Sequence, residues 1–372
     1  MPPYAYVAAS ADDALSIFDV QYANPTFVGS IQGAGAPPRG NWLNGAYSVS
    51  LKKARAHVAC IFDNALTIID VFDPTTPTFL GSIQGAGAEP WLGNAHGVFV
   101  KDDLAYVAAP ADNALTIIDV SNPTNPTFVG SIRGAGAPPG GNWLQSARHV
   151  YVVGNLAYVT AMLDDALTII DVSDPTNPTF VGSIQGAGAP PGGNWLGQAL
   201  HLEVIGNYAY IAAYNDNAFT IIDVSNPAAP TFVGSIQGAG VPPGGNWLFL
   251  PMSVHIVGNL AYIPAHNDNA LTIISIANPA IPAFVGSIQG AGAPPGGNWL
   301  GGACEAHVRG NLAYVTADSD NALTVINVAN PAAPVFLGTI RGAGAPNYLS
   351  APQWCAVSYA PTVQTLPATE IT

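Results

Sequence analysis

Histidine is the residue type whose placement in this sequence most directly suggests chemistry. The chain has seven histidines, and six of them occupy a few equivalent positions of a repeated pattern, leaving only His57 outside. Imidazole can exchange hydrogen bonds, titrate near neutral pH and bind a metal ion. An arginine, a glutamate and three aromatic residues share these repeat positions. The resulting candidates for ligand binding are Tyr47, His96, Arg148, His149, His201, Tyr214, His255, His266, Glu305, His307 and Trp354.

A repeat of about 50 residues positions these candidates. Its clearest copy runs from Gly154 to Leu202, and related copies fill most of the chain. A fixed period of this length indicates seven structural units in a single domain. The alanine that opens each apolar run recurs at Ala14, Ala65, Ala114, Ala166, Ala218, Ala270 and Ala322, with spacings of 51, 49, 52, 52, 52 and 52 residues.

Each unit is expected to contain four short β-strands and no helix. In one unit these are residues 156–160, 167–172, 179–184 and 200–204, which are rich in apolar and β-branched residues. An Asp-Asp or Asp-Asn turn joins the first two runs. A segment such as Asn122 to Pro126 forms the next turn, because proline cannot continue a ladder of hydrogen bonds.

Seven such units predict an all-β fold, a seven-bladed β-propeller of four-stranded antiparallel blades. An open β-solenoid is the alternative architecture. The first unit lacks its innermost strand, and residues 353–359 supply one strand of that type at the other end of the chain. Pairing of the N- and C-terminal strands would close the ring and remove exposed sheet edges, which favours the propeller. Residues 1–360 then form the propeller, and residues 361–372 form a C-terminal tail.

The strand motif LTIIDVSNPTNPTFVG, at residues 115–130, resembles the LVIVD repeat. The resemblance extends over the chain to about Ala360, and it departs from the motif at Phe18, Ser275 and Asn327. Members of that family look like β-propellers of this kind. The resemblance therefore implies a fold and very little chemistry.

The candidate residues are expected to lie around the central channel. They occur five, six or eight residues after a tryptophan that recurs in the loops, or directly before the Asp-Asn turn. In a propeller, the loop that enters the innermost strand and the loop that joins the second and third strands lie on the same face. Both sets should therefore meet at one mouth, and they differ from blade to blade, as one asymmetric site requires. The competing interpretation is that a wet channel simply tolerates variation.

A glycine-rich loop carrying this tryptophan recurs in most units. The aromatic positions are Trp42, Trp91, Trp143, Trp195, Trp247, Trp299 and, in the last unit, Tyr348. A ring of equivalent loops could stack on sugars, which makes a multivalent carbohydrate-binding lectin the alternative function. The other interpretation is that each tryptophan anchors its loop on the next blade, since a shared geometric requirement produces identical residues.

A metal site is a narrower hypothesis. His149, His201 and Glu305 share one repeat position and could converge, as a His-His-carboxylate site requires. They lie on blades that are well separated, so a bound metal is not expected. We find no nucleophile elbow and no close carboxylate pair at the mouth beyond Glu305 with Asp318, so no catalytic residues are assigned. Cys304 and Cys355 lie on neighbouring blades, where either a disulfide or two buried thiols would fit.

Charge and composition exclude several functional classes. The formal net charge is -14, with only nine Lys plus Arg, which argues against binding to nucleic acid or an anionic membrane surface. Most copies place one or two Asp residues beside the same turn, where a structural role is expected. No signal peptide or membrane span is visible, so a cytoplasmic location is predicted.

The sequence therefore predicts a non-enzymatic propeller that holds one small molecule at the channel mouth. The near-identical, low-charge repeats are also similar to those of pigment-bearing chromoproteins of oyster-type mushrooms, which implies an aromatic chromophore as the ligand. A lectin that binds glycans is the first alternative. A metal-dependent enzyme with a histidine-rich channel site is the second.

Overall fold

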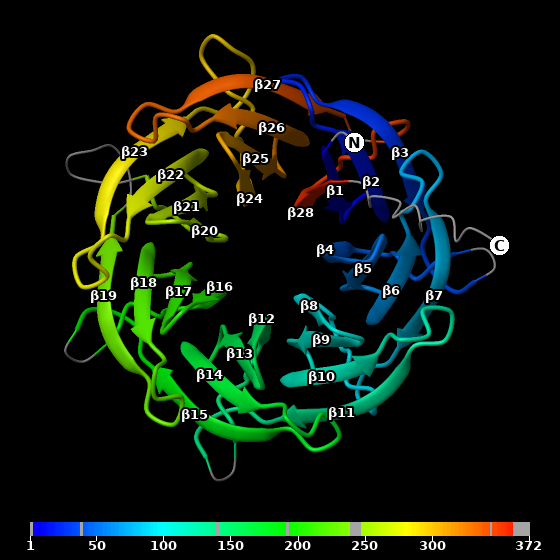
Figure 1. The fold of residues 1–372 in the computed structure, drawn as a ribbon, viewed down its shortest axis with the longest axis vertical. Coiled ribbons are helices and arrows are strands. Elements are labelled where there is room, and N and C mark those ends of the chain that lie inside the picture. The colour runs from blue at the N-terminus through cyan, green and yellow to red at the C-terminus, as the bar shows by residue number, and fades with distance from the viewer. Residues whose placement is uncertain are drawn as a thin grey trace, which may run out of the picture.

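The computed structural model describes residues 3–37, 40–138, 141–190, 193–238, 247–342 and 344–359. These residues form 28 β-strands in seven four-stranded antiparallel sheets, which surround a central axis (Figure 1). The predicted all-β, seven-bladed propeller is confirmed. In the part of the chain so described, no helix is long and apolar enough to cross a membrane.

Each blade runs from an inner strand beside the channel to an outer strand at the rim. Blade 1 contains β28 (Pro352–Tyr359), β1 (Pro3–Ala9), β2 (Ala14–Asp19) and β3 (Thr26–Gln32); blade 2 contains β4 (Ala46–Lys52), β5 (Arg55–Cys60), β6 (Ala65–Asp70) and β7 (Thr78–Gln84). Blade 3 contains β8 (Val98–Lys101), β9 (Leu104–Ala109), β10 (Ala114–Asp119) and β11 (Thr127–Arg133); blade 4 contains β12 (Ala147–Val153), β13 (Leu156–Ala161), β14 (Ala166–Asp171) and β15 (Thr179–Gln185). Blade 5 contains β16 (Ala199–Ile205), β17 (Tyr208–Ala213), β18 (Ala218–Asp223) and β19 (Thr231–Gln237); blade 6 contains β20 (His255–Val257), β21 (Leu260–Ala265), β22 (Ala270–Ser275) and β23 (Ala283–Gln289). Blade 7 contains β24 (Ala303–Arg309), β25 (Leu312–Ala317), β26 (Ala322–Asn327) and β27 (Val335–Arg341).

The hydrophobic core lies between neighbouring blades. The two middle strands of each blade are almost completely buried, and their apolar side chains pack against those of the next blade. Between blades 4 and 5, for example, Leu167 and Ile169 pack with Leu202 and Ile211. Seven clusters of this kind occur, so every blade needs both neighbours to bury its two faces.

The two chain ends close the ring in blade 1. Strand β28 pairs antiparallel with β1, with Tyr4 opposite Ser358 and Ala5 opposite Val357. The predicted pairing of terminal strands is therefore confirmed, and no sheet edge is left between the first and last units. The predicted tail, residues 361–372, lies outside the described residues.

The acidic turns hold the glycine-rich loops in place. In blade 4 the buried Asp164 accepts hydrogen bonds from the backbone N–H groups of Gln145 at 2.8 Å and Gly136 at 3.2 Å. The Thr168 hydroxyl donates to the carbonyl of Trp143 at 2.7 Å, and the same Thr-to-Trp bond recurs in other blades. The Asp residues beside the turns therefore have a structural role, as the sequence indicated.

Candidate functional site

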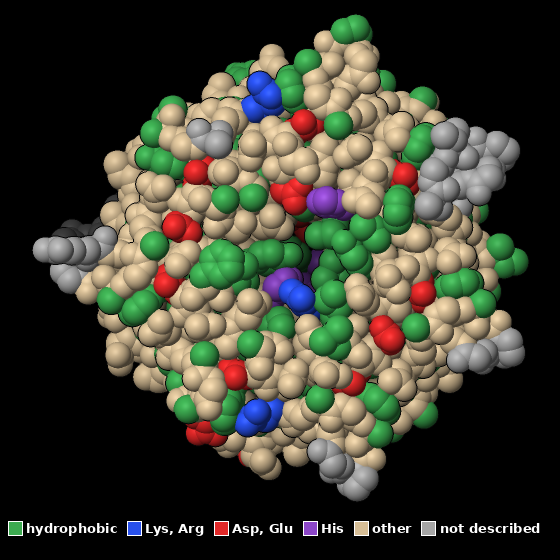
Figure 2. All heavy atoms as spheres, turned by 180° about the vertical axis from the view of Figure 1, so that it is seen from behind, with side chains coloured by type: hydrophobic (Ala, Val, Ile, Leu, Met, Phe, Trp, Pro, Cys, Tyr) green, Lys and Arg blue, Asp and Glu red, His purple; other side chains and the backbone are tan. Residues whose placement is uncertain are grey.

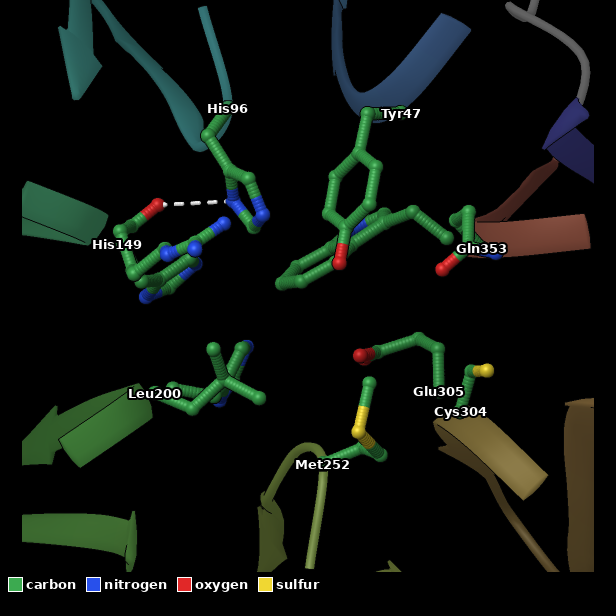
Figure 3. A pocket seen from close by; sticks show the side chains of 11 residues that line it. Tyr47, His96, His149, Leu200, Met252, Cys304, Glu305 and Gln353 are labelled. Atoms are coloured by element: carbon green, nitrogen blue, oxygen red, sulfur yellow. Dashed lines mark hydrogen bonds between the residues drawn. The ribbon is translucent and has the colours of Figure 1, made fainter. Parts of the chain in front are cut away.

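The central channel opens into a pocket at one end. Figure 2 shows this hollow in the middle of one face, where histidine, basic and acidic side chains lie among hydrophobic ones. The pocket narrows inward to a cavity volume of about 20 Å³, and Figure 3 shows how side chains from all seven blades point into it. Its lining residues are Tyr47, His96, Arg148, His149, Leu200, His201, Met252, Cys304, Glu305, Gln353 and Trp354.

A β-bulge explains why two consecutive residues of one inner strand face this pocket. In blade 4, Ala147 pairs with Ala161 and His149 pairs with Thr160, which leaves Arg148 as the extra residue. An unpaired residue of this kind turns its side chain away from the regular alternation of a strand. The same register shift occurs at Tyr47, Leu200, Cys304 and Gln353, so the bulge aims a different side chain into the mouth from each of these blades.

The turns between the second and third strands complete the rim of the mouth. Met162, Tyr214 and His266 lie in these turns and line a wider part of the hollow together with Tyr47 and Arg148. Residues from both variable sets of the sequence therefore meet at this face, as the connectivity of a propeller predicted.

Three mutually adjacent rings form the floor of the mouth pocket. The rings of His149 and His201 are stacked, with centres 4.0 Å apart and planes at 27°. The indole of Trp354 lies against both, stacked with His149 at 5.2 Å and tilted relative to His201 at 4.9 Å. This group divides the channel, because it lines the mouth pocket on one side and a second cavity on the other.

Three of the four imidazoles that line the mouth are neutral at neutral pH, whereas the hydrogen bond to Asp318 raises the pKa of the fourth, His266. Burial lowers the pKa of His149 to about 3 and holds those of His96 and His201 well below their usual value. The Nδ1 atom of His201 accepts a hydrogen bond from the backbone N–H of Val254 at 3.3 Å, which places its remaining proton on Nε2. In His96, Nδ1 instead donates to the Arg148 carbonyl at 3.1 Å. Each ring therefore offers one fixed hydrogen-bonding atom to a ligand.

Arg148 carries the positive charge of the pocket. No ion pair to its guanidinium occurs among the described residues, and its Nε atom is buried without a hydrogen-bond partner. Burial lowers the pKa of Arg148, although the neighbouring Tyr47 hydroxyl opposes the shift, and arginine stays charged at neutral pH. Burial also raises the pKa of Glu305 well above its usual range.

Two predicted site residues lie on the far side of the floor. His255 and His307 line the second cavity, of about 160 Å³, with Tyr151 and Glu203. His255 donates from Nδ1 to Glu203 Oε1 at 2.9 Å, and burial lowers the pKa of His307 to about 3. The structure therefore divides the predicted set between two ends of the channel. The apolar lining residues Leu200 and Met252 were not among the predicted candidates, although they share their repeat position with Tyr47 and Arg148.

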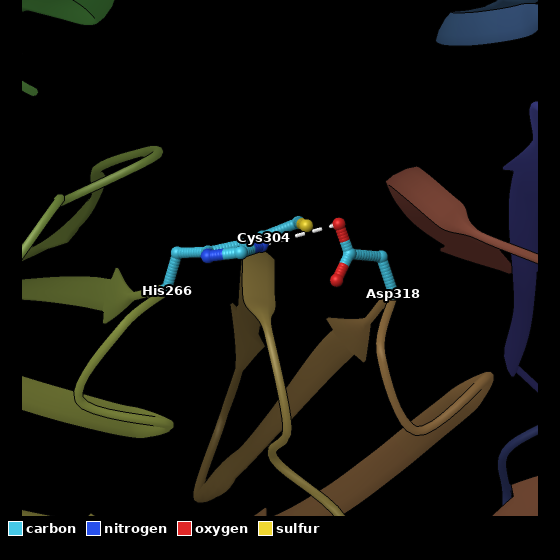
Figure 4. Close-up of side chains that lie close together, drawn as sticks. All are labelled: His266, Cys304 and Asp318. Atoms are coloured by element: carbon cyan, nitrogen blue, oxygen red, sulfur yellow. Dashed lines mark hydrogen bonds and ion pairs between the residues drawn. The ribbon is translucent and has the colours of Figure 1, made fainter.

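The histidines of the floor do not converge with Glu305 as a metal site would need. Their rings stack face to face, and the one group of three potential metal ligands among the described residues is elsewhere, at His266, Cys304 and Asp318 (Figure 4). Cys304 and Cys355 are both free and buried, so the two thiols are not bridged.

Comparison with known proteins identifies the repeat and the fold. The model of the LVIVD repeat family matches six segments of the chain, namely residues 46–84, 92–133, 145–185, 196–237, 251–289 and 300–341. No protein with a curated description matches the sequence.

Solved structures share the architecture at low sequence identity. A functionally unknown protein from Desulfotomaculum acetoxidans has a TM-score of 0.68 and 13% identity, with 95% of this chain and 98% of that chain covered. A protein from Lactobacillus plantarum has a TM-score of 0.73 and 12% identity, with coverage of 96% and 99%. The periplasmic gluconolactonase of Pseudomonas aeruginosa has a TM-score of 0.70 and 12% identity, with coverage of 97% and 100%. At these identities the likeness shows the fold alone.

Proposed function

The chain belongs to the LVIVD repeat family, and we propose that it is a non-enzymatic propeller that binds one small aromatic anion at the channel mouth. The observation that carries the proposal is the guanidinium of Arg148, which projects into the mouth without an acidic partner among the described residues. A partly buried charge of this kind is stabilised by an opposite charge with hydrogen-bond acceptors, and carboxylates and phosphates fit guanidinium best.

The walls of the pocket favour an apolar, planar body on that anion. Leu200 and Met252 contribute apolar surface, and Met162 and Tyr214 extend it at the rim. Aromatic and thioether groups of this kind pack well against conjugated rings. An aromatic pigment carrying a carboxylate is one ligand of the proposed class.

The electrostatics of the mouth support recognition in preference to proton transfer. The pKa values of His149, His201 and His96 lie far below neutral pH because the rings are buried. General acid–base catalysis works best when the catalytic pKa lies near the operating pH. These imidazoles are better suited to hold the polar edges of a ligand than to exchange protons with it.

The first experiment is an absorbance spectrum of the purified protein, followed by mass spectrometry of any extracted compound. Binding is then measured by calorimetry on protein stripped of small molecules, with benzoate, 2-naphthoate and 4-phenylbenzoate as probes. The corresponding carboxamides are the neutral references. We expect a single site and at least about tenfold preference for the carboxylates, because a charged hydrogen bond is worth about 1.5–3 kcal/mol.

The variant Arg148→Gln should lose this preference while keeping the fold. Arg133→Gln is the matched control, because Arg133 stacks on the ring of Trp91 away from the channel and glutamine occupies its position in other blades. Equal binding of carboxylates and carboxamides, or an unchanged preference in Arg148→Gln, would overturn the proposal. Hydrolysis of gluconolactone that is lost in Arg148→Gln would show an enzyme instead.

A further inference from the structure

Three side chains with metal-binding atoms converge beside the mouth pocket. His266 lies in the turn between β21 and β22, Cys304 on β24, and Asp318 in the turn between β25 and β26. One ligand atom from each lies within 4.8 Å of the other two, and Figure 4 shows the three side chains turned toward one another. His266 and Cys304 also line the hollow of the mouth.

We propose that His266, Cys304 and Asp318 bind one divalent transition-metal ion, with zinc as the best match. Zinc prefers imidazole nitrogen, thiolate sulfur and carboxylate oxygen, and sites with three protein ligands keep one coordination position open. Tetrahedral bonds of about 2.0–2.3 Å place neighbouring donor atoms roughly 3.3–3.8 Å apart. His266 Nε2 and Asp318 Oδ2 are 3.2 Å apart, so small side-chain rotations suffice to admit the ion.

The hydrogen bonds around the cluster direct its donor atoms inward. His266 Nδ1 lies 3.1 Å from the side-chain oxygen of Asn267, and Ser319 donates its hydroxyl to Asp318 Oδ1 at 2.9 Å. His266 Nε2 lies at hydrogen-bond distance from Asp318 Oδ2, 3.2 Å, so a proton of the imidazole joins the two groups, and a bound ion would take the place of that proton. The outer hydrogen bonds to Asn267 and Ser319 are of the kind that orient histidine and carboxylate ligands in metal sites.

The thiol completes a donor set that the propeller scaffold does not require. The Sγ atom of Cys304 lies 3.2 Å from the Gly302 carbonyl, beside the His266–Asp318 contact that the dashed line in Figure 4 marks. On binding, the ion replaces the thiol proton, which is released to solvent. The repeat positions of His266 and Asp318 carry Ser10, Phe62, Pro110, Met162 and Tyr214 in the other blades.

A second histidine–carboxylate pair in the same molecule serves as a control. His255 and Glu203 are 2.9 Å apart in the far cavity, but the other nitrogen of His255 already lies 3.3 Å from the Val308 carbonyl. Both ring nitrogens are thus occupied by protein groups, and this pair is not part of a three-ligand cluster among the described residues. We expect metal binding at the His266 cluster and not at His255.

The test is titration of the chelator-treated full-length protein with Co²⁺, followed by competition with Zn²⁺. We expect one equivalent of Co²⁺, with a sulfur-to-cobalt charge-transfer absorption that Zn²⁺ abolishes. Cys304→Ser should remove that absorption, and His266→Ala and Asp318→Asn should weaken Zn²⁺ binding by more than about tenfold. Ser319→Ala should weaken it by about tenfold, as outer-shell changes do. His255→Ala should bind as the parent protein does.

Two results would overturn this inference. One is the absence of a charge-transfer band in the parent protein, which needs no variant and so does not depend on variant folding. The other is an unchanged Zn²⁺ affinity in folded Cys304→Ser and His266→Ala. The site does not rest on the proposed aromatic anion, since Arg148→Gln leaves all three ligands in place.

Discussion

The outer strands and loops of this propeller contrast with its inner strands. Around the rim the same residues recur in blade after blade, for example the Thr168 hydroxyl that binds the Trp143 carbonyl. Along the channel the equivalent positions hold Arg148 in one blade and Leu200 in the next. The residues of the outer strands and loops repeat because each blade must pack against similar neighbours in the same geometry. The channel wall has no such requirement, so its residues are free to form an asymmetric site.

The loop tryptophans belong to the part of the molecule that repeats from blade to blade. Five of the six, all but Trp91, and also Tyr348 adopt positive φ angles between 43° and 53°, a strained conformation for residues other than glycine. Arg133 and Arg341 cover the rings of Trp91 and Trp299 at 3.8 Å and 3.5 Å from the ring centres. These contacts support the interpretation that the tryptophan anchors its loop.

The largest effect is expected when the strand that closes the ring is removed, because both the repeated scaffold and the channel wall depend on the closed ring. A chain that ends at Ala351 loses β28, which leaves β1 as an open edge and exposes Ala5 and Val7, which had packed in the same core cluster as Cys355 and Val357. We expect aggregation or loss of the folded state, measured by size-exclusion chromatography and thermal denaturation. A chain that ends at Tyr359 is the control. A monomeric, equally stable shorter chain would contradict the closed topology.

The next largest effect is destabilisation of the folded protein by acid. It is caused by buried histidines both outside the channel and in its floor. Burial lowers the pKa of His57, outside the channel positions, to about 4, and that of His149, in the channel floor, to about 3. Both are neutral when folded and become protonated near pH 6.5 when unfolded. Their contribution to the free energy of unfolding is therefore complete above about pH 6.5. It is lost as the pH falls toward the pKa that each histidine has in the folded state.

The free energy of unfolding should accordingly drop by up to roughly 3 kcal/mol for each histidine between pH 7 and pH 4. Urea denaturation at several pH values measures the slope. Substitution of His149 by Gln should flatten it, since glutamine does not titrate. Parallel pH profiles for the parent and variant proteins would show that His149 does not contribute.

A smaller effect is expected for the carboxylates that hold the loops. Asp164→Ala removes two acceptors from backbone N–H groups and leaves these donors partly buried, which should cost about 1–3 kcal/mol. Asp171→Ala is the control from the same blade, because Asp171 is more exposed and accepts from its near neighbour Ser173. Chemical denaturation measures both. Equal losses for the two variants would mean that Asp164 does not anchor the loop.

The sequence predicts the repeated part of the molecule much better than the channel wall. Period and turn chemistry place strands such as β13 and β14 within about one residue, because each unit repeats the same local preferences. The convergence at the mouth follows from propeller connectivity. The stack of His149 on Trp354 does not follow, because it depends on bulges and on side-chain packing across the ring. That stack is what separates His255 from the mouth.

The smallest effect is expected when a loop tryptophan is replaced. This substitution distinguishes the single-site interpretation from the lectin alternative. Trp195 does not line the mouth, and the Thr220 hydroxyl binds its carbonyl, which any residue at this position retains. Trp195→Ala should therefore leave the affinity for 2-naphthoate within about twofold and the stoichiometry at one, with modest destabilisation from lost packing. Calorimetry and cell agglutination measure the two properties. Glycan-dependent agglutination that weakens as loop tryptophans are replaced would instead assign binding to the repeated loops.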